Sequence, residues 1–373
     1  MEFSFTDEQR AIAELAAQIL TDRCALERLK AIELSHDRYD RELWAEFAKA
    51  GLLGAALPDS VGGSGGSFID ICLLLEQQGR RLAPLPLLPA LVSAAMPLAR
   101  FGSAEQQQRY LPGVVAGTTL LTAALSELGT DSRAPITTAK PDGKHWRLTG
   151  VKVAVPVAHA AAAVLVPART PDGQIGLFLI DPKAPGVTLA RQDTMNWESQ
   201  SRMELSNVAV GPEALLGPIG QGAQHLNWIV DRTTVGLCAI ASGACQEALR
   251  ITAEYTSNRK QFDKPIAMFQ AVGQRMADSY IDNEAVNLTM WQAASRLADE
   301  TPSPKEIDTA KYWASEGGSR IGHAALHLHG GISIDVDYPI HRYFLWLKQI
   351  ENTLGAATPH LVHLGAIIAA ESL

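Results

Sequence analysis

The spacing of apolar residues changes twice along this chain of 373 residues. In the first and last zones, apolar residues recur three and four positions apart, as on one face of an α-helix. In the middle zone, short apolar runs are bounded by Gly, Pro and Asp, which is typical of β-strands and turns. The sequence therefore predicts an α+β fold with an N-terminal helical domain (1–118), a small β domain (119–225) and a C-terminal helical bundle (226–373).

Several elements can be placed within these zones. Thr6 and Gln9 have the spacing of a capping box, which predicts a helix start near the N-terminus. Apolar periodicity predicts further helices, and short apolar runs predict strands in the middle zone. The expected helices cover residues 68–80, 242–257, 269–298 and 304–328, and the expected strands include residues 146–150, 162–166 and 177–180.

Composition narrows the class of partner. The net charge is −8, which argues against nucleic acid because phosphate neutralisation needs a surplus of Lys and Arg. The four cysteines have no metal-binding spacing, so we predict buried thiols and no metal site. The charged start, residues 1–8, does not match a signal peptide, and Pro, Gly or charge interrupts the apolar stretches. We therefore expect a cytoplasmic protein without a membrane span.

Three motifs follow one another in the C-terminal zone. Arg259-Lys-Gln-Phe262 precedes Phe269-Gln270, and His329-Gly330-Gly331 comes later. With Trp44 to Gly54 near the start and Tyr338-Pro339 to Tyr343 near the end, their order resembles the acyl-CoA dehydrogenase family over nearly the whole chain. The resemblance implies that family's fold, with a C-terminal four-helix bundle, and FAD as cofactor.

The resemblance assigns roles to these residues. Arg259 would bind the FAD pyrophosphate, since a guanidinium bonds phosphate in a bidentate manner. Phe262 and Gln270 would contact the adenosine. Gly330 and Gly331 would bring backbone close to the cofactor, and His327, where relatives usually carry Gln, would be a weaker contact. The alternatives are a solvated Arg259 beside a core Phe262, and a helix C-cap at the glycines.

The middle zone departs from the family pattern. Ser126 and Ser132 remain in a loop where relatives contact the flavin ring and the thioester, which makes them candidate substrate-binding residues. Leu128 and Arg133 replace the Pro and Asp of that loop. The following segment, residues 153–156, lacks the Trp and Thr that face the flavin in relatives. A flavin ring bound here would therefore lack expected contacts.

The catalytic base is the largest departure. Desaturation of an acyl-CoA removes an α proton, which a carboxylate in a dry pocket does well because burial raises its pKa. The two positions where relatives carry this Glu hold Leu354 and Thr233. Glu351 and Asp231 are the nearest acids, but helical geometry would turn Glu351 away from Leu354, and we expect Asp231 to be structural. No catalytic residue is therefore predicted in this chain.

The narrower resemblance accounts for this absence. Arg275 to Asp282 and Leu354 to Thr358 look like the non-catalytic subunit of α2β2 acyl-CoA dehydrogenases that degrade steroid side chains. The resemblance implies a homologous partner that supplies the Glu, a bulky acyl-CoA substrate and an electron-transfer flavoprotein as acceptor. The alternatives are a self-sufficient homomeric flavoenzyme with a displaced base, and a scaffold without flavin.

Overall fold

The computed structural model describes residues 4–371, so the first three residues of the charged N-terminal segment lie outside it. Its contacts divide the chain into two compact units. The first contains the residues up to Ala31, Phe68–Ala83 and the chain from Thr234 onward, and the second contains Ile32–Ser67 and Pro84–Thr233. Each unit is therefore built from segments that are distant in sequence.

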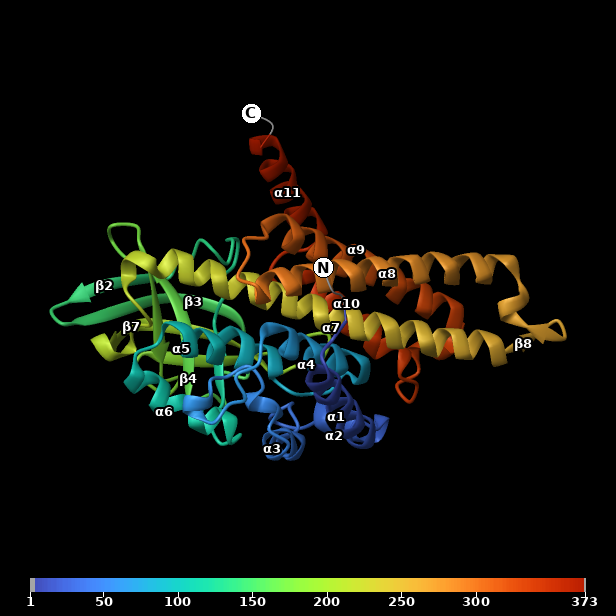
Figure 1. Cartoon of the computed structure of the whole chain (residues 1–373), viewed down its shortest axis with the longest axis horizontal. Helices are drawn as coiled ribbons and strands as arrows, with labels where there is room; N and C mark the ends of the chain where they lie inside the picture. Colours follow the sequence, from blue (N-terminus) through green and yellow to red (C-terminus); the bar gives the residue numbers. More distant parts are fainter. Residues whose placement is uncertain (1–3, 372–373) are drawn as a thin grey trace. The chain divides into compact units, whose positions relative to one another are not determined.

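The first unit is helical (Figure 1). In its C-terminal part, α9 packs against α8, α10 and α11, while α1 packs against α4 near the N-terminus. The capping box predicted at Thr6 and Gln9 is present. Its helices are α1 (Asp7–Arg23), α2 (Leu26–Glu33), α4 (Phe68–Arg81), α7 (Gly222–Asn258), α8 (Gln270–Ala298), α9 (Pro304–His329), α10 (Ile340–Asn352) and α11 (Ala357–Glu371), of which α2 and α7 continue across the boundary between the units.

Two glycines let α4 and α7 approach each other at backbone distance. A Cβ on Gly79 would lie 2.0 Å from the carbonyl oxygen of Ile240, and one on Gly243 would lie 1.9 Å from that of Glu76. Close by, Glu76 accepts hydrogen bonds from Ser242 and Gln246. Glycine is therefore required at both positions for this packing.

The second unit contains a mixed sheet in the order β1-β4-β2-β3-β7-β6. The remaining strand, β5, also pairs with β4. The pairings of β4 with β1 and β2 are parallel, and the rest are antiparallel. Leu148, Val164, Phe178 and Met203 belong to its core. The strands are β1 (Leu121–Ala123), β2 (Thr138–Asp142), β3 (His145–Pro156), β4 (Ala163–Arg169), β5 (Ile175–Ile180), β6 (Val187–Gln192) and β7 (Gln200–Val210).

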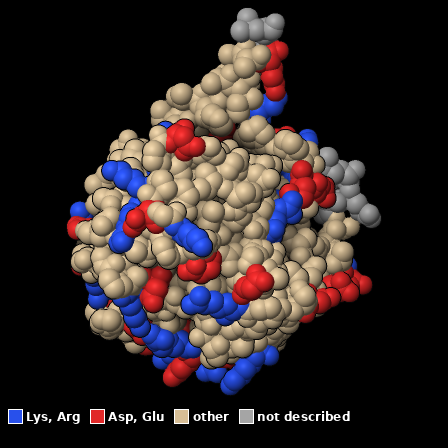
Figure 2. Space-filling model, turned by 90° about the vertical axis from the view of Figure 1, so that its left-hand side faces the viewer, with Lys and Arg blue, Asp and Glu red and all other residues tan. Residues whose placement is uncertain are grey.

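Short helices complete the second unit. They are α3 (Arg41–Lys49), a π-helical segment (Leu88–Ala95), α5 (Met96–Phe101) and α6 (Ala104–Val115), with 3-10 turns at Leu52–Gly54, Asp59–Val61, Pro212–Ala214 and Ile219–Gln221. On the face shown in Figure 2, acidic and basic side chains are interspersed among uncharged ones, and this face carries no basic patch.

The predicted fold class is confirmed, with adjustments at element ends. The helix expected over 242–257 is part of α7, which has 37 residues. Phe269 is the N-cap of α8 and not its first residue, because its backbone is extended. The three-domain boundaries stay a prediction.

One stretch of the described residues, Ile340–Glu371, is long and apolar enough to cross a membrane by length and composition alone, contrary to our expectation from sequence. In the structure it is two helices, and α10 buries Tyr343 and Trp346 within the first unit. The apolar window of this stretch is 0% buried and α11 has no buried residue, so it is not a buried core helix, but a single such stretch is weak evidence for a membrane span.

Candidate functional site

Aromatic contacts bring together the end of α7 and the end of α9. Tyr255, on the last turns of α7, stacks on His329 with ring centroids 4.4 Å apart, and its hydroxyl donates to the His329 carbonyl. Tyr338 packs against both rings. His329 is buried, which lowers its pKa. This cluster holds the chain around Arg259 close to the chain around Gly330.

A short hairpin follows α7 and carries the motif that begins with Arg259. Strands β8 (Lys260–Gln261) and β9 (Lys264–Pro265) pair at the end of the α7–α8 arm (Figure 1). The two residues between them, Phe262 and Asp263, have φ angles of 53° and 63°. A type I′ turn requires positive φ at both positions, which usually favours Asn and Gly. Strained residues of this kind cluster at functional sites.

Phe262 is 87% exposed, so the alternative of a core phenylalanine is wrong. Its ring lies in a T-shaped arrangement with that of Phe269, with centroids 6.2 Å apart. The Arg259 side chain is also exposed. An exposed cation beside an exposed aromatic ring is available to a ligand that carries both phosphate and a base.

Gln270 and His327 lie on the neighbouring helices. Gln270 is exposed at the first residue of α8. His327, near the end of α9, accepts a hydrogen bond at Nδ1 from Arg275 of α8, with 2.7 Å between the nitrogens. Because arginine only donates, the proton of a neutral His327 ring is on Nε2, which leaves that atom as a donor.

Gly330 and Gly331 begin the 3-10 turn Gly330–Ile334. Gly330 caps α9 with φ 63°, and its N–H bonds back to His327 and Leu326, which fits the C-cap alternative. A Cβ on either glycine would meet no atom within 4 Å. The space beside this backbone is open, as a cofactor contact requires, and that contact stays a prediction.

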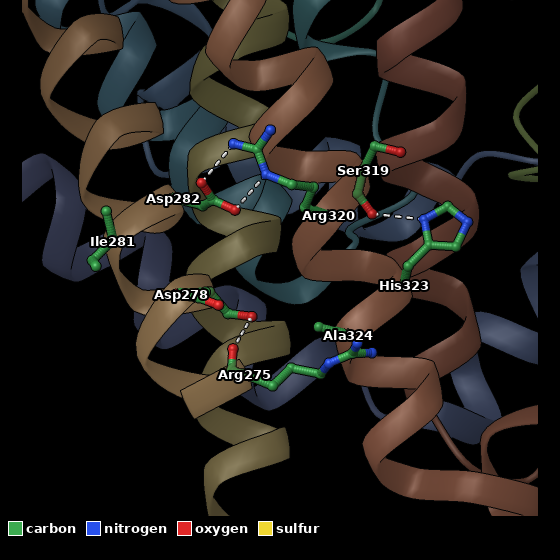
Figure 3. Close-up of a pocket in the computed structure, with 9 residues that line it drawn as sticks. Arg275, Asp278, Ile281, Asp282, Ser319, Arg320, His323 and Ala324 are labelled. Carbon is green, nitrogen blue, oxygen red and sulfur yellow. Dashed lines mark hydrogen bonds and ion pairs between the residues drawn. The ribbon is translucent and has the colours of Figure 1, made fainter. Parts of the chain in front are cut away.

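A groove of about 610 Å³ runs between α8 and α9 (Figure 3). Arg275, Asp278, Asp282, Arg320 and His323 are among its lining residues. Arg320 binds Asp282 in a bidentate manner, with N···O distances of 2.6 and 2.8 Å. The Arg275–Asp282 segment, which carries the narrower resemblance, therefore lines one wall of this groove.

In the second unit, a buried ion pair anchors the loop of Ser126 and Ser132. Glu127 lies 2.6 Å from Lys152 Nζ and accepts from the N–H groups of Ile136 and Thr137. Burial alone would raise the pKa of Glu127, but the charge and hydrogen bond of Lys152 bring it below its usual value. The two serines thus lie on one fixed loop, apart in sequence and unit from Arg259.

Strand β3 is irregular where relatives place their flavin contacts. Its pairing with β7 shifts between Lys152 and Val155. Ala154 has φ 51° there, and its N–H donates to Gln192. Val153 pairs with Ser126 through its backbone. This bulge presents small aliphatic side chains and no hydroxyl donor.

The first base position holds no carboxylate. Thr233 is buried on α7, and its hydroxyl lies 3.0 Å from that of Ser93. The nearby acid, Asp231, pairs with Arg133 at 2.5 Å. Arg133 stands where relatives carry an Asp in this loop. The replacement in the loop therefore forms an ion pair with Asp231 of α7. The carboxylate of Asp231 is thus engaged by Arg133, and its structural role stays a prediction.

The second base position lies in a turn. Helix α10 ends at Asn352, and Leu354 has φ 56° before Gly355. The helical angle used to exclude Glu351 therefore does not apply to Leu354. Glu351 is nonetheless occupied, because its carboxylate pairs with Lys348 at 2.6 Å. Neither position offers an unpaired carboxylate.

Two residues important to this region were missed from sequence. Lys152 anchors the Ser126 loop, and Lys311 of α9 donates to the carbonyls of Ile350 and Glu351 just before Leu354. Both lysines are buried; Lys311 sits in the helix expected over 304–328, and Lys152 follows the strand expected over 146–150. A lysine on the apolar face of such a segment was the available signal.

Two family models match this chain. Residues 6–118 match the acyl-CoA dehydrogenase N-terminal domain, and residues 220–361 match the C-terminal domain. Acyl-CoA dehydrogenase FadE27 of Mycobacterium tuberculosis is 38% identical over 377 residues, which cover 99% of each protein.

Solved structures give the same result. The ChsE4-ChsE5 complex from Mycobacterium tuberculosis contains a chain with a TM-score of 0.94 and 38% identity, covering 99% of both chains. A variant of the Tcur3481-Tcur3483 steroid ACAD matches with a TM-score of 0.92 and 46% identity, covering 98% of this chain and 99% of that one. Homologues with this fold bind FAD.

Proposed function

This chain belongs to the acyl-CoA dehydrogenase family, and we propose that it acts there as the non-catalytic, FAD-completing subunit of a heteromeric enzyme. The family's enzymes are oxidoreductases that act on the CH–CH group of an acyl-CoA. In the proposed α2β2 assembly, a homologous subunit supplies the catalytic Glu and most contacts to the flavin ring.

The observation that carries this proposal is the state of the two base positions. Leu354 and Thr233 have no acidic group, and the neighbouring acids, Glu351 and Asp231, are held by Lys348 and Arg133. A general base must reach the α proton with a free carboxylate. Since this chain offers none at either position, we propose that a partner subunit supplies the base.

The other half of the proposal concerns FAD. Arg259, Phe262, Gln270 and the glycines at 330 and 331 are exposed in the single chain, which suits contacts across a subunit interface. Arg259 would bind the pyrophosphate, and Phe262 and Gln270 the adenosine. Bound FAD supplies the acceptor for the hydride that leaves the β carbon. This chain's residues would hold the cofactor in place.

The bulge in β3 supports a division of labour. Val153 and Ala154 offer neither the aromatic wall nor the hydroxyl that relatives place against the flavin. A subunit that only completes the nucleotide end of the site has no need of them. Ser126 and Ser132 stay candidates for contact with the acyl-CoA.

The proposed substrate is a bulky acyl-CoA, most specifically one with a steroid side chain. Two of the similar structures are heteromeric, and one of them is described as a steroid ACAD. An electron-transfer flavoprotein is the proposed acceptor. Turnover of steroid-derived and straight-chain acyl-CoA thioesters by the assembled enzyme tests this assignment.

The ratio of flavin to protein tests the split site. The chain is purified alone and then together with a glutamate-bearing homologue, and bound flavin is measured by absorbance after gel filtration. We expect little FAD on the single chain and about one per heterodimer. A full complement on the single chain would instead indicate a homomeric flavoenzyme, and a colourless complex would indicate a scaffold.

Arg259→Ala in the assembled complex tests the assigned contact. Loss of a charge-assisted bond to phosphate should raise the Kd for FAD about ten-fold or more. Arg147→Ala is the matched control, since it removes another partly exposed arginine, on β3 of the second unit, and should leave FAD binding unchanged. Equal FAD retention by both variants would contradict the role of Arg259.

A further inference from the structure

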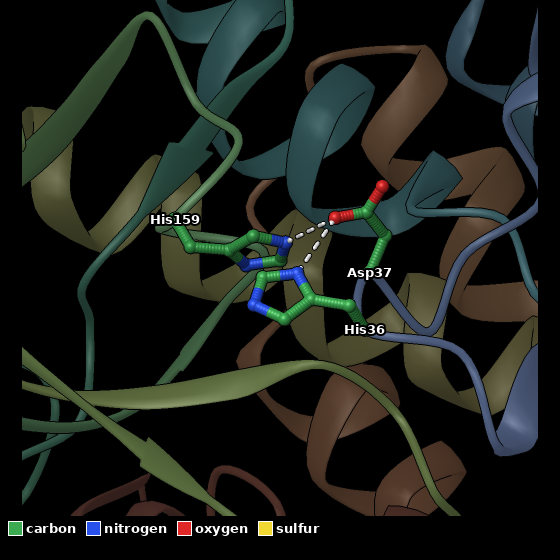
Figure 4. Close-up of side chains that lie close together, drawn as sticks. All are labelled: His36, Asp37 and His159. Atoms are coloured by element: carbon green, nitrogen blue, oxygen red, sulfur yellow. Dashed lines mark hydrogen bonds and ion pairs between the residues drawn. The ribbon is translucent and has the colours of Figure 1, made fainter.

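A second cluster of polar side chains lies in the second unit and does not involve the residues discussed above. His36 and Asp37 belong to the segment between α2 and α3, and His159 belongs to the turn between β3 and β4. Figure 4 shows both imidazole rings directed at the same carboxylate oxygen of Asp37. Three side chains from two separate segments thus converge on one point.

The three atoms lie close enough together to share one ion. His36 Nδ1 lies 3.2 Å and His159 Nε2 3.4 Å from Asp37 Oδ1, and one ligand atom from each residue lies within 4.8 Å of the others. Zinc bonds of about 2.0–2.2 Å in a tetrahedron place neighbouring ligand atoms about 3.3 Å apart. Small ring rotations would therefore complete the arrangement.

The carboxylate of Asp37 is held in place by a neighbouring side chain. Its other oxygen, Oδ2, accepts a hydrogen bond of 2.6 Å from Arg41 Nε. Outer contacts of this kind orient a ligating carboxylate. The remaining oxygen, Oδ1, faces the two histidines as an acceptor.

The ring of His159 is oriented to act as a ligand through Nε2. Its Nδ1 lies 3.2 Å from the hydroxyl of Ser199, and a hydrogen bond at one ring nitrogen is how proteins orient a metal-binding histidine through the other. Its Nε2 is buried and makes no hydrogen bond, despite its distance of 3.4 Å from Asp37.

The surroundings leave room for an ion on one side. His36 is 87% exposed, so solvent reaches the cluster and can supply a water as the fourth ligand. The guanidinium of the nearby Arg38 forms an ion pair with Asp193 at 2.8 Å and lies over the ring of Trp197. Its charge is therefore compensated outside the cluster, and Arg41 is the cation that directly contacts a ligand.

We propose that His36, Asp37 and His159 bind a zinc ion, with water in the fourth position. The ion would tie the segment between α2 and α3 to the turn between β3 and β4. That segment includes the buried Arg38, whose φ of 51° is unfavourable for a residue other than glycine. The proposed site is independent of the flavin and of the identity of any partner.

Titration of the tag-free, full-length chain with Zn²⁺ tests the proposal. Isothermal titration calorimetry should give one equivalent per chain, and metal analysis after dialysis should retain it. His36→Ala and His159→Ala should each weaken binding at least about ten-fold, since loss even of an outer contact has an effect of this size. The control is His145→Ala, an exposed histidine of β3, which should bind as the unchanged chain does.

Because His36 is exposed, we expect His36→Ala to fold as the unchanged chain does. Circular dichroism checks this. Zn²⁺ should raise the Tm of the unchanged chain and of His145→Ala, and should not raise that of His36→Ala. Absence of a Zn²⁺ equivalent in the unchanged chain, or retention of full affinity in both ligand variants, would overturn the proposal.

Discussion

Each unit of the molecule contains a lysine that is fully buried, and the two are held in different ways. Lys152 in the sheet has an anionic partner, Glu127, at 2.6 Å, and also donates to the carbonyl of Pro167. Lys311 in α9 donates to the hydroxyl of Ser315 and to the carbonyls of Ile350 and Glu351. Burial lowers the pKa of both lysines to about 8.

The difference shows two ways to hold a charge away from water. Lys152 is stabilised by a full negative charge, whereas Lys311 relies on the partial negative charge of carbonyls at the C-terminal end of α10. Both lysines anchor segments where relatives carry substrate-binding or catalytic residues. These segments are the loop of Ser126 and the turn of Leu354. The buried charges thus fix backbone geometry beside sites whose usual catalytic residues are absent.

Lys152→Met should have the largest effect, because it leaves Glu127 as an unpaired buried charge. We expect the free energy of unfolding to fall by about 3–5 kcal/mol. Urea denaturation followed by circular dichroism measures it. Combining the change with Glu127→Gln should recover part of the loss, since no buried charge then remains. Equal losses in the single and double variants would show that the ion pair is not the cause.

Lys311→Met should have a smaller effect, because it leaves only neutral acceptors without a donor. Unsatisfied buried carbonyls cost about 1–3 kcal/mol in the free energy of unfolding. The same denaturation measurement applies. A loss larger than that of Lys152→Met would reverse the comparison and indicate that the end of α10 depends on this charge more than the sheet depends on its ion pair.

The pH dependence of stability should show the smallest effect per pH unit. Burial lowers the lysine pKa from 10.5 to about 8, so between these pH values the folded chain loses lysine protons that the unfolded chain keeps. The free energy of unfolding therefore rises with pH above about 8, by at most about 1.4 kcal/mol per pH unit for each lysine. This gain is lost again as the pH falls through 8. The free energy of unfolding should therefore rise less steeply in Lys311→Met than in the unchanged chain. Parallel slopes would contradict the lowered pKa of Lys311.

The sequence predicts local features well. Periodicity places the long helices, and the pairing of Thr6 with Gln9 marks a helix start that the structure contains. Phe269 is an exception of one residue, because its extended backbone makes it a cap. Helix α7 begins well before the expected residue 242, since the residues before it continue in the same helix and no proline interrupts them.

The site is predictable only where a motif is contiguous. Arg259 to Phe262 can be read directly, but the positive φ values of Phe262 and Asp263 cannot, because neither residue is typical of such a turn. The partners of Lys152 and Lys311 are distant in sequence, as is His159 from His36. Which groups share a buried space depends on the tertiary fold, so the ion pairs and the proposed zinc site required the structure.

The contact between α4 and α7 has a consequence for how this protein can change in evolution. At Gly79 and Gly243 the obstructing atoms are main-chain carbonyl oxygens, which no substitution elsewhere can shrink. A mutation at either position therefore has no compensating side-chain change at the other, and both helices would have to move apart together. Lineages that descend from this chain are therefore expected to keep glycine at both positions.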